Sequence, residues 1–116
     1  MNCKETSIAI ALVLSAVSIN ASSNEMSIPR SVAGDKGKYF ILETKKTGNI
    51  IQAVHKRVGP DSVGYTRTET NCSTMQMREL GYSEESPQAI KLNPTKWFEL
   101  VPGSSKSDLA NFVCKK

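Results

Sequence analysis

Residues 65–72, YTRTETNC, decide the fold, because two kinds of side chain alternate along them. Three threonines and the cysteine occupy one set of alternate positions, and larger polar side chains occupy the other. Successive side chains of a β-strand point to opposite faces, so this alternation predicts a strand with one small-sided face that includes Cys72. A helix docked on such a face can approach the sheet as closely as a disulfide requires.

The C-terminal tail is the segment that can supply this helix. Ser105 is a capping residue type and Asp108 suits a first helical turn, so a helix of about ten residues is predicted with Ser105 as its N-terminal cap. The apolar positions 109, 112 and 113 then share one face, and Cys114 lies beside that face. A helix this short is marginal alone in water, so packing and a covalent link must hold it.

The first 21 residues have the three parts of a secretory signal peptide. Lys4 is the positive side chain of the start, residues 8–19 form a short apolar run, and small residues follow at 21–23. The run has about a dozen residues, whereas a membrane-spanning helix needs about 20. The alternative, a buried N-terminal helix of a cytosolic protein, fits less well because polar residues follow at once. We therefore predict cleavage near Ala21 or Ser23 and an exported protein, either periplasmic or secreted, with the cell surface as a further destination.

Export leaves an even number of cysteines. Cys3 precedes the apolar run and leaves with the signal peptide, whereas a lipid-anchor cysteine would follow the run, so no stable membrane anchor is indicated. Cys72 and Cys114 remain, and an even count in a short exported chain predicts a disulfide rather than two free buried thiols. The bond would close a loop of about 43 residues, for which the loop-entropy model gives about 4 kcal/mol.

The rest of the chain predicts one small domain. Residues 22–37 are polar and contain glycines, which predicts a flexible leader, and residues 38–116 form the domain. Further strands are predicted at 38–43 and 50–58, joined as a hairpin, and at 89–92 and 97–101, while 74–80 suits a strand or a helix. The predicted fold class is α+β, a small antiparallel β-sheet with a C-terminal helix tethered across it by the disulfide.

The composition argues against several functions. The net charge of +4 comes from scattered basic residues, which indicate a solvated surface or weak attraction to anionic partners, because nucleic-acid binding needs a denser stripe. His55 is the only histidine, so a metal site is not indicated and the usual kind of catalytic base has one candidate. Nucleophile-elbow, phosphate-loop and dinucleotide motifs are missing from the sequence. We predict a non-enzymatic protein with no catalytic, cofactor-binding or metal-binding residues and no nucleic-acid partner.

Several segments of the domain together resemble the bacterial surface-adhesin protein E-like family. The resemblance covers roughly residues 38–114, and its segments are 58–72, Arg78 with 80–82, 97–104 and 112–114. The pattern is a strand that ends in Asn-Cys, an arginine soon after, a tryptophan-bearing strand, Pro-Gly-Ser, and a short helix that ends in cysteine. It implies an antiparallel sheet with a helix tied across it by Cys72 and Cys114, a homodimer, and binding to extracellular matrix proteins such as vitronectin and laminin.

The function predicted from these observations is binding, by an exported adhesin-like protein, of a host or envelope macromolecule, most simply a protein. The alternative is a periplasmic inhibitor or envelope accessory protein of unknown target. A third hypothesis, a small hydrolase with His55 as its base, is the least supported by the sequence. Only Cys72 and Cys114 are carried over from the family as site residues, and their role is structural.

Overall fold

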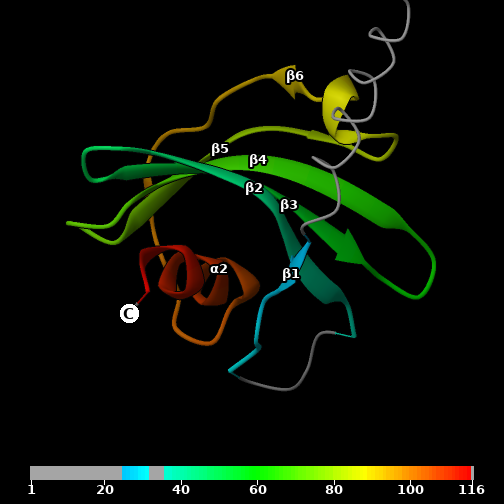
Figure 1. Cartoon of the computed structure of the whole chain (residues 1–116), viewed down its shortest axis with the longest axis horizontal. Helices are drawn as coiled ribbons and strands as arrows, with labels where there is room; N and C mark the ends of the chain where they lie inside the picture. Colours follow the sequence, from blue (N-terminus) through cyan, green and yellow to red (C-terminus); the bar gives the residue numbers. More distant parts are fainter. Residues whose placement is uncertain (1–24, 32–35, 116) are drawn as a thin grey trace, which may run out of the picture.

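The computed structural model describes residues 25–31 and 36–115, and in them a single antiparallel sheet dominates (Figure 1). Its strands lie in the order β1-β2-β3-β4-β5-β6, and β7 also pairs with β5. The elements are β1 (Met26–Ser27), β2 (Lys38–Thr47), β3 (Ile50–Val58), β4 (Val63–Asn71), β5 (Gln76–Ser83), the 3₁₀ turn η3 (Pro87–Ala89), β6 (Lys91–Leu92), β7 (Phe98–Glu99) and α2 (Ser105–Cys114). The predicted antiparallel sheet with a C-terminal helix is confirmed.

The described part of the molecule has two layers, because the sheet curves over α2 and α2 lies under one of its faces (Figure 1). The core fills the space between these layers. Its buried members are Ile28, Tyr39, Ile41, Ala53, Met77, Leu109 and Ala110, and Phe98, Phe112 and Val113 are among the partly buried residues packed against it. A domain this small has a thin core, so the disulfide to the helix is expected to contribute substantially to its stability.

Strand β4 confirms the prediction made from its alternating sequence. Thr68 and Thr70 are fully buried on the face that also carries the core residue Met77, which lies directly opposite Thr70 in β5. Their short side chains let α2 approach the sheet closely. The strand begins at Val63, slightly earlier than expected, because it continues through Gly64 opposite Arg57 of β3.

The hairpin of β2 and β3 is longer than predicted. Strand β3 has the expected bounds, but β2 continues to Thr47, and only residues 48 and 49 form the turn. Gly48 has a φ of 62°, which a two-residue hairpin turn with glycine first requires. Lys45 and Lys46 belong to the strand although they look like turn residues in the sequence, because an exposed strand end accepts charged side chains.

Two irregularities bend the long strands. The register of β2 against β3 shifts between Ile41 and Glu43, so Leu42 is an extra residue in β2. A second shift, between β4 and β5, lies at Arg67 and Thr68. Such bulges sharpen the local twist and bend of a sheet, which fits the curved surface that covers α2 (Figure 1).

Strand β5 settles the ambiguous segment at 74–80. A turn with Met75 at a φ of 56° leads into a strand that runs to Ser83, so the segment is a strand and extends past position 80. Downstream, the two short strands are shorter than predicted, with β6 limited to two residues after η3 and β7 limited to Phe98–Glu99. Of the neighbouring aromatic residues, Phe98 packs on the core and Trp97 is 37% exposed.

The expected flexible leader is wrong for residues 26–30. Strand β1 pairs with Phe40 and Ile41 of β2, and Ile28 is 4% exposed within the core. Ile28 is an apolar anchor in a polar segment, and a hydrogen bond from its N–H to the Tyr39 carbonyl (2.8 Å) fixes it. The predicted signal peptide, residues 1–21, lies outside the described residues. In the described part of the chain, no helix has both the length and the apolar character to cross a membrane.

The start of α2 differs from the prediction by one residue. Ser104 caps the helix, since its hydroxyl accepts a hydrogen bond from the Ser107 N–H (3.1 Å), and Ser105 is the first helical residue. Asp108 lies in the first turn, as predicted. The helix ends at Cys114, and Lys115 follows with a left-handed backbone at a φ of 57°.

Candidate functional site

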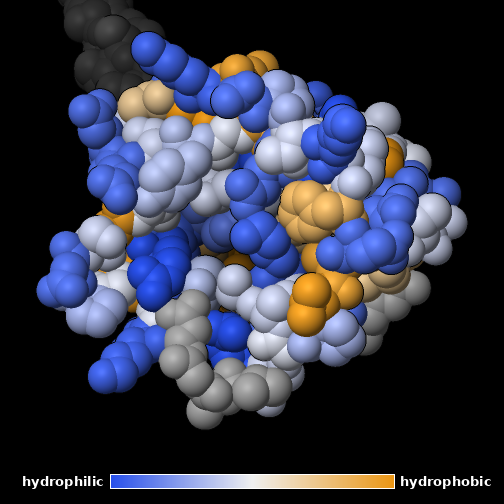
Figure 2. Space-filling view, turned by 180° about the vertical axis from the view of Figure 1, so that it is seen from behind, coloured by the Kyte–Doolittle hydropathy of each residue, from blue (hydrophilic) through white to orange (hydrophobic). Residues whose placement is uncertain are grey.

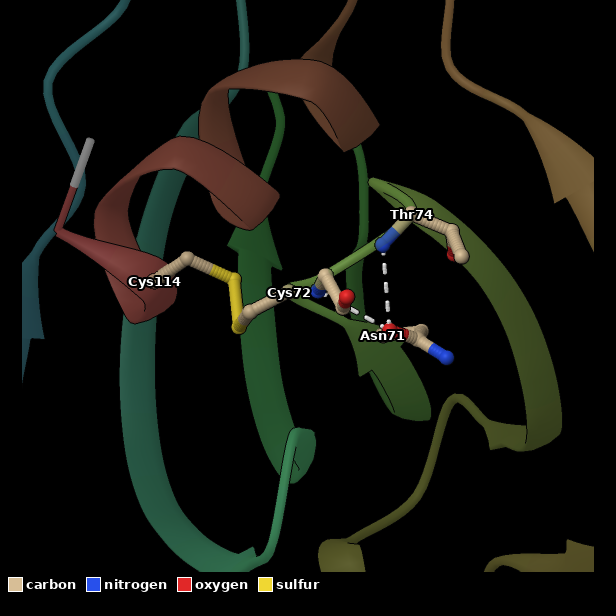
Figure 3. The surroundings of a disulfide bond; sticks show 5 residues. Asn71, Cys72, Thr74 and Cys114 are labelled. Atoms are coloured by element: carbon tan, nitrogen blue, oxygen red, sulfur yellow. Dashed lines mark hydrogen bonds between the residues drawn. A yellow bond between two sulfur atoms is a disulfide. The ribbon is translucent and has the colours of Figure 1, made fainter.

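The predicted disulfide joins Cys72, just after β4, to Cys114 at the end of α2 (Figure 3). The two Cα atoms are 5.7 Å apart, within the usual range for a disulfide. The side-chain oxygen of Asn71 accepts hydrogen bonds from the backbone N–H groups of Ser73 and Thr74 (2.9 and 3.1 Å), which shapes the turn that carries Cys72. This bond holds the C-terminal end of α2 against the sheet.

A buried carboxylate holds the opposite end of α2. Asp108 is 6% exposed and accepts hydrogen bonds from Arg30 Nε (2.7 Å), the Ser31 N–H (3.1 Å) and the Ser31 hydroxyl (2.7 Å). Burial alone would raise the pKa of Asp108, but the hydrogen bonds from Arg30 and Ser31 outweigh it and lower the pKa. The segment after β1 is thereby fixed to the helix.

An open groove of about 840 Å³ lies between β2 and α2. Its apolar lining comes from three elements that are far apart in the sequence. These residues are Met26 of β1, Ile41 and Leu42 of β2, and Phe112 and Val113 of α2. Met26 is 53% exposed, so an apolar side chain at the groove remains open to solvent. An apolar concave surface with a few polar groups at its margin is the usual character of a binding site.

The groove runs beside an uncovered strand edge. Strand β1 pairs with β2 only at Phe40 and Ile41, and among the described residues 43–47 pair with β3 alone. An uncovered edge presents backbone N–H and C=O groups that can pair with another chain. The groove therefore combines apolar contact area with unpaired backbone groups.

The charges around the groove are mainly positive. Asp108 is paired with Arg30, and the carboxylate of Glu43 lies 3.7 Å from Arg67. Lys45 and Lys46 on the β2 edge, and Lys115 at the end of α2, have no carboxylate partner within the described ranges. The edge and the groove thus attract negatively charged groups.

A second, smaller hollow of about 250 Å³ lies near the N-terminal end of α2 and is polar. Its lining includes His55, Glu79 and Lys106, and the last two form an ion pair at 3.1 Å. Burial lowers the pKa of His55 to about 4, and Lys106 adds to the effect while Glu79 opposes it. His55 is therefore neutral at pH 7, and its buried Nδ1 has no hydrogen-bond partner among the described residues.

The described residues contain little that resembles a reaction centre. No hydrogen bond is recorded between a serine hydroxyl and His55 in these ranges, and no group of three or more histidine, cysteine, aspartate or glutamate side chains is placed to hold a metal ion there. The polar hollow offers one neutral imidazole and an ion pair that is already satisfied. The groove between β2 and α2 is the stronger candidate site, because it is larger, more apolar and bounded by a strand edge that no other described strand covers.

The other exposed apolar residues among those described do not line the groove. Figure 2 shows, on the face seen from behind, small hydrophobic patches separated by hydrophilic residues. Trp97 is covered on one side by the guanidinium of Arg78, whose Cζ lies 5.1 Å from the ring centre. Leu92 and Val101 are 70% and 67% exposed and lie in β6 and in the loop before α2. Some exposed apolar side chains are normal on a protein surface.

Sequence reasoning found the disulfide but not the groove. Met26 lies in the segment that was expected to be flexible, and Leu42 lies at a β-bulge that the local sequence does not predict. The only usable signal was the apolar face of the tail helix, which includes Phe112 and Val113. Comparison with protein-family models, curated proteins and solved structures finds no match to this chain.

Proposed function

We propose that this chain is an exported, non-enzymatic, adhesin-like domain that binds another protein in the groove between β2 and α2. The observation that carries the proposal is the groove itself, an apolar concavity of about 840 Å³ beside an uncovered strand edge. Small ligands favour enclosed pockets, whereas an open groove along a strand edge suits a polypeptide. The disulfide supports export, because such bonds persist in oxidising compartments.

The groove is also well prepared for binding. Both ends of α2 are fixed, one by the Asp108 hydrogen bonds and the other by the disulfide. A binding surface that is already rigid loses less entropy when a partner docks. The Asp108 hydrogen bonds and the disulfide therefore do more than stabilise a small core, since they also hold α2 at a set distance from β2.

The test uses two matched variants, Met26→Lys and Leu92→Lys. Both replace an exposed apolar residue by lysine in a two-residue strand, so the net charge of both variants is the same, but Met26 lines the groove and Leu92 lies near the opposite edge of the sheet. The probes are immobilised laminin and vitronectin, with an unrelated basic protein of equal charge as the control analyte. We expect saturable binding that Met26→Lys weakens at least tenfold and Leu92→Lys leaves within twofold.

Two results would overturn the proposal. One is binding no stronger than that of the basic control protein, and the other is equal loss in both variants, which would place the contact outside the groove. Fractionation of cells that express the full chain tests the exported location separately. Recovery of the chain in the cytosol, with residues 1–21 still attached and with Cys72 and Cys114 reduced, would contradict it.

A further inference from the structure

The uncovered edge of β2 indicates how a partner would bind. We propose that the partner segment enters the groove as an added β-strand along residues 43–47, and that it alternates apolar with acidic side chains. This inference rests on the proposed function, because it specifies the partner of the same groove. Strand addition is a common mode of peptide recognition, in which backbone hydrogen bonds give affinity and alternate side chains give specificity.

The hairpin register identifies the backbone groups that are available. Thr47 and Ile50 flank the two-residue turn, so they exchange hydrogen bonds within the hairpin. Alternate residues of β2 then point their N–H and C=O groups away from β3, and these residues are Thr44 and Lys46. Among the described residues, no strand lies on that side of them.

The same register places the side chains of an added strand. Thr44 lies opposite the buried core residue Ala53, so it belongs to the face of the sheet that covers α2. Residues of the added strand on this face would point into the groove, toward Phe112 and Val113. Lys46 shares the Thr44 face, and residues of the added strand on the other face would lie beside Glu43 and Lys45. One face of the partner strand therefore contacts the apolar groove and Lys46, and the other face contacts Lys45.

The lysines decide between an acidic partner and a second copy of this chain. Lys45 and Lys46 follow one another on the edge, and Lys115 adds a third positive charge at the end of α2. Pairing two β2 edges would bring these lysines together, and like charges on neighbouring strands are destabilising. Glu43 is the one carboxylate on this edge, and Arg67 lies beside it at 3.7 Å. Acidic residues in the partner strand lie beside Lys45 instead, and Lys46 and Lys115 add to the positive potential around them.

The probe is a synthetic peptide of seven residues with valine and aspartate in alternation, compared with a peptide in which lysine replaces aspartate. Amide exchange measured residue by residue by NMR reports where the peptide lies. We expect the Thr44 and Lys46 amides to exchange rapidly in the free protein and to become protected when the acidic peptide binds. The Lys45 amide points toward β3, so it should be protected in both states.

A charge-reversal pair tests the acidic preference. Lys45→Glu with Lys46→Glu should weaken binding of the acidic peptide by about tenfold and strengthen binding of the lysine peptide, because it reverses the direct contact with Lys45 and the longer-range attraction of Lys46. The matched control is Lys91→Glu with Lys96→Glu, which makes the same change in net charge on exposed residues at and after β6. The control variant should bind the acidic peptide within threefold of the unmodified protein.

Each other occupant of the edge gives its own result, and each would overturn the inference. Protection of Thr44 and Lys46 in the free protein at all concentrations means that the chain's own residues before Glu25 cover the edge. Protection that grows with protein concentration, together with a dimeric mass in sedimentation, means a second copy. Equal binding of the acidic and lysine peptides, or no binding of either, would rule out an acidic β-strand as the partner. The Met26→Lys comparison on intact proteins is independent of these outcomes, so the proposed function can survive when strand addition fails.

Discussion

Acid should destabilise this protein through His55 at a higher pH than through Asp108. Burial is the main cause that lowers the pKa of His55 from the unfolded value of 6.5 to about 4 in the folded protein. Between these values the unfolded chain binds a proton that the folded chain does not. The free energy of unfolding therefore falls as the pH drops from 6.5 toward 4, and the contribution is fully retained only above 6.5.

The size of the effect follows from the two pKa values. One pKa unit corresponds to about 1.4 kcal/mol, so integration of the linkage relation gives a loss of about 2 kcal/mol by pH 5 and about 3 kcal/mol by pH 4, relative to pH 7. For a small domain with a total stability of about 5–15 kcal/mol, this is a large fraction. The titration of Asp108 does not overlap with this range. Its pKa in the folded protein is lowered from the usual value of 3.8, so the stability that it contributes is lost only below about pH 3.8.

The assay is urea unfolding at pH 7, 6, 5 and 4.5, with His55→Gln as the comparison. Glutamine keeps a polar side chain but does not titrate, so its curve should lack the loss between pH 6.5 and 4.5. The difference between the two proteins, rather than either curve alone, isolates His55 from the other titrating groups. A difference that stays constant within about 0.5 kcal/mol over this range would refute the reasoning, since it would mean that His55 has the same pKa in both states.

Three further predictions concern the attachments of α2 and the strand beneath it. Replacing Cys72 and Cys114 together by serine should lower the free energy of unfolding by up to about 4 kcal/mol, as measured in urea, and a loss below about 1 kcal/mol would contradict a structural role. Asp108→Asn should lower the free energy of unfolding by about 2–3 kcal/mol at pH 7, because it removes a charge-assisted pair from a buried site. Lys106→Met removes a more exposed ion pair, so in the same assay it should lower the free energy of unfolding by less than about 1 kcal/mol. Thr68→Val should raise the thermal midpoint, with a gain of about 1 kcal/mol, because it removes a buried hydroxyl that has no hydrogen-bond partner among the described residues; a lower midpoint would indicate that the hydroxyl is satisfied.

The parts of the fold that the sequence predicted are those fixed by local patterns. Alternation along residues 65–72 reports which side chains face the helix, and the structure buries Thr68 and Thr70 there. The apolar spacing of the tail gave the helix and its length, and the two remaining cysteines gave its attachment. Each of these features depends on the order of neighbouring residues, and such order is visible in one sequence.

The parts that were missed depend on contacts between distant residues. The segment of β1 looks flexible because its composition is polar, and only its pairing with Phe40 and Ile41 and the distant carboxylate of Asp108 order it. The bulge at Leu42 is equally hidden, since it is defined by register against β3. A local pattern cannot report a partner that lies 77 positions away, as Ser31 and Asp108 do.

The groove arises from these missed features, and for this reason it was missed as well. Strand β1 ends its pairing at Ile41, and the extra residue at Leu42 shifts the register just where β2 loses its neighbour. Beyond that point, among the described residues, β2 pairs with β3 alone for half of its length, and the disulfide holds α2 beside it. The covalent link that the sequence predicts for stability therefore also fixes one wall of the groove. Reduction of the disulfide should then weaken partner binding in conditions where the domain is still folded, and this distinguishes a prepared groove from one that forms on contact.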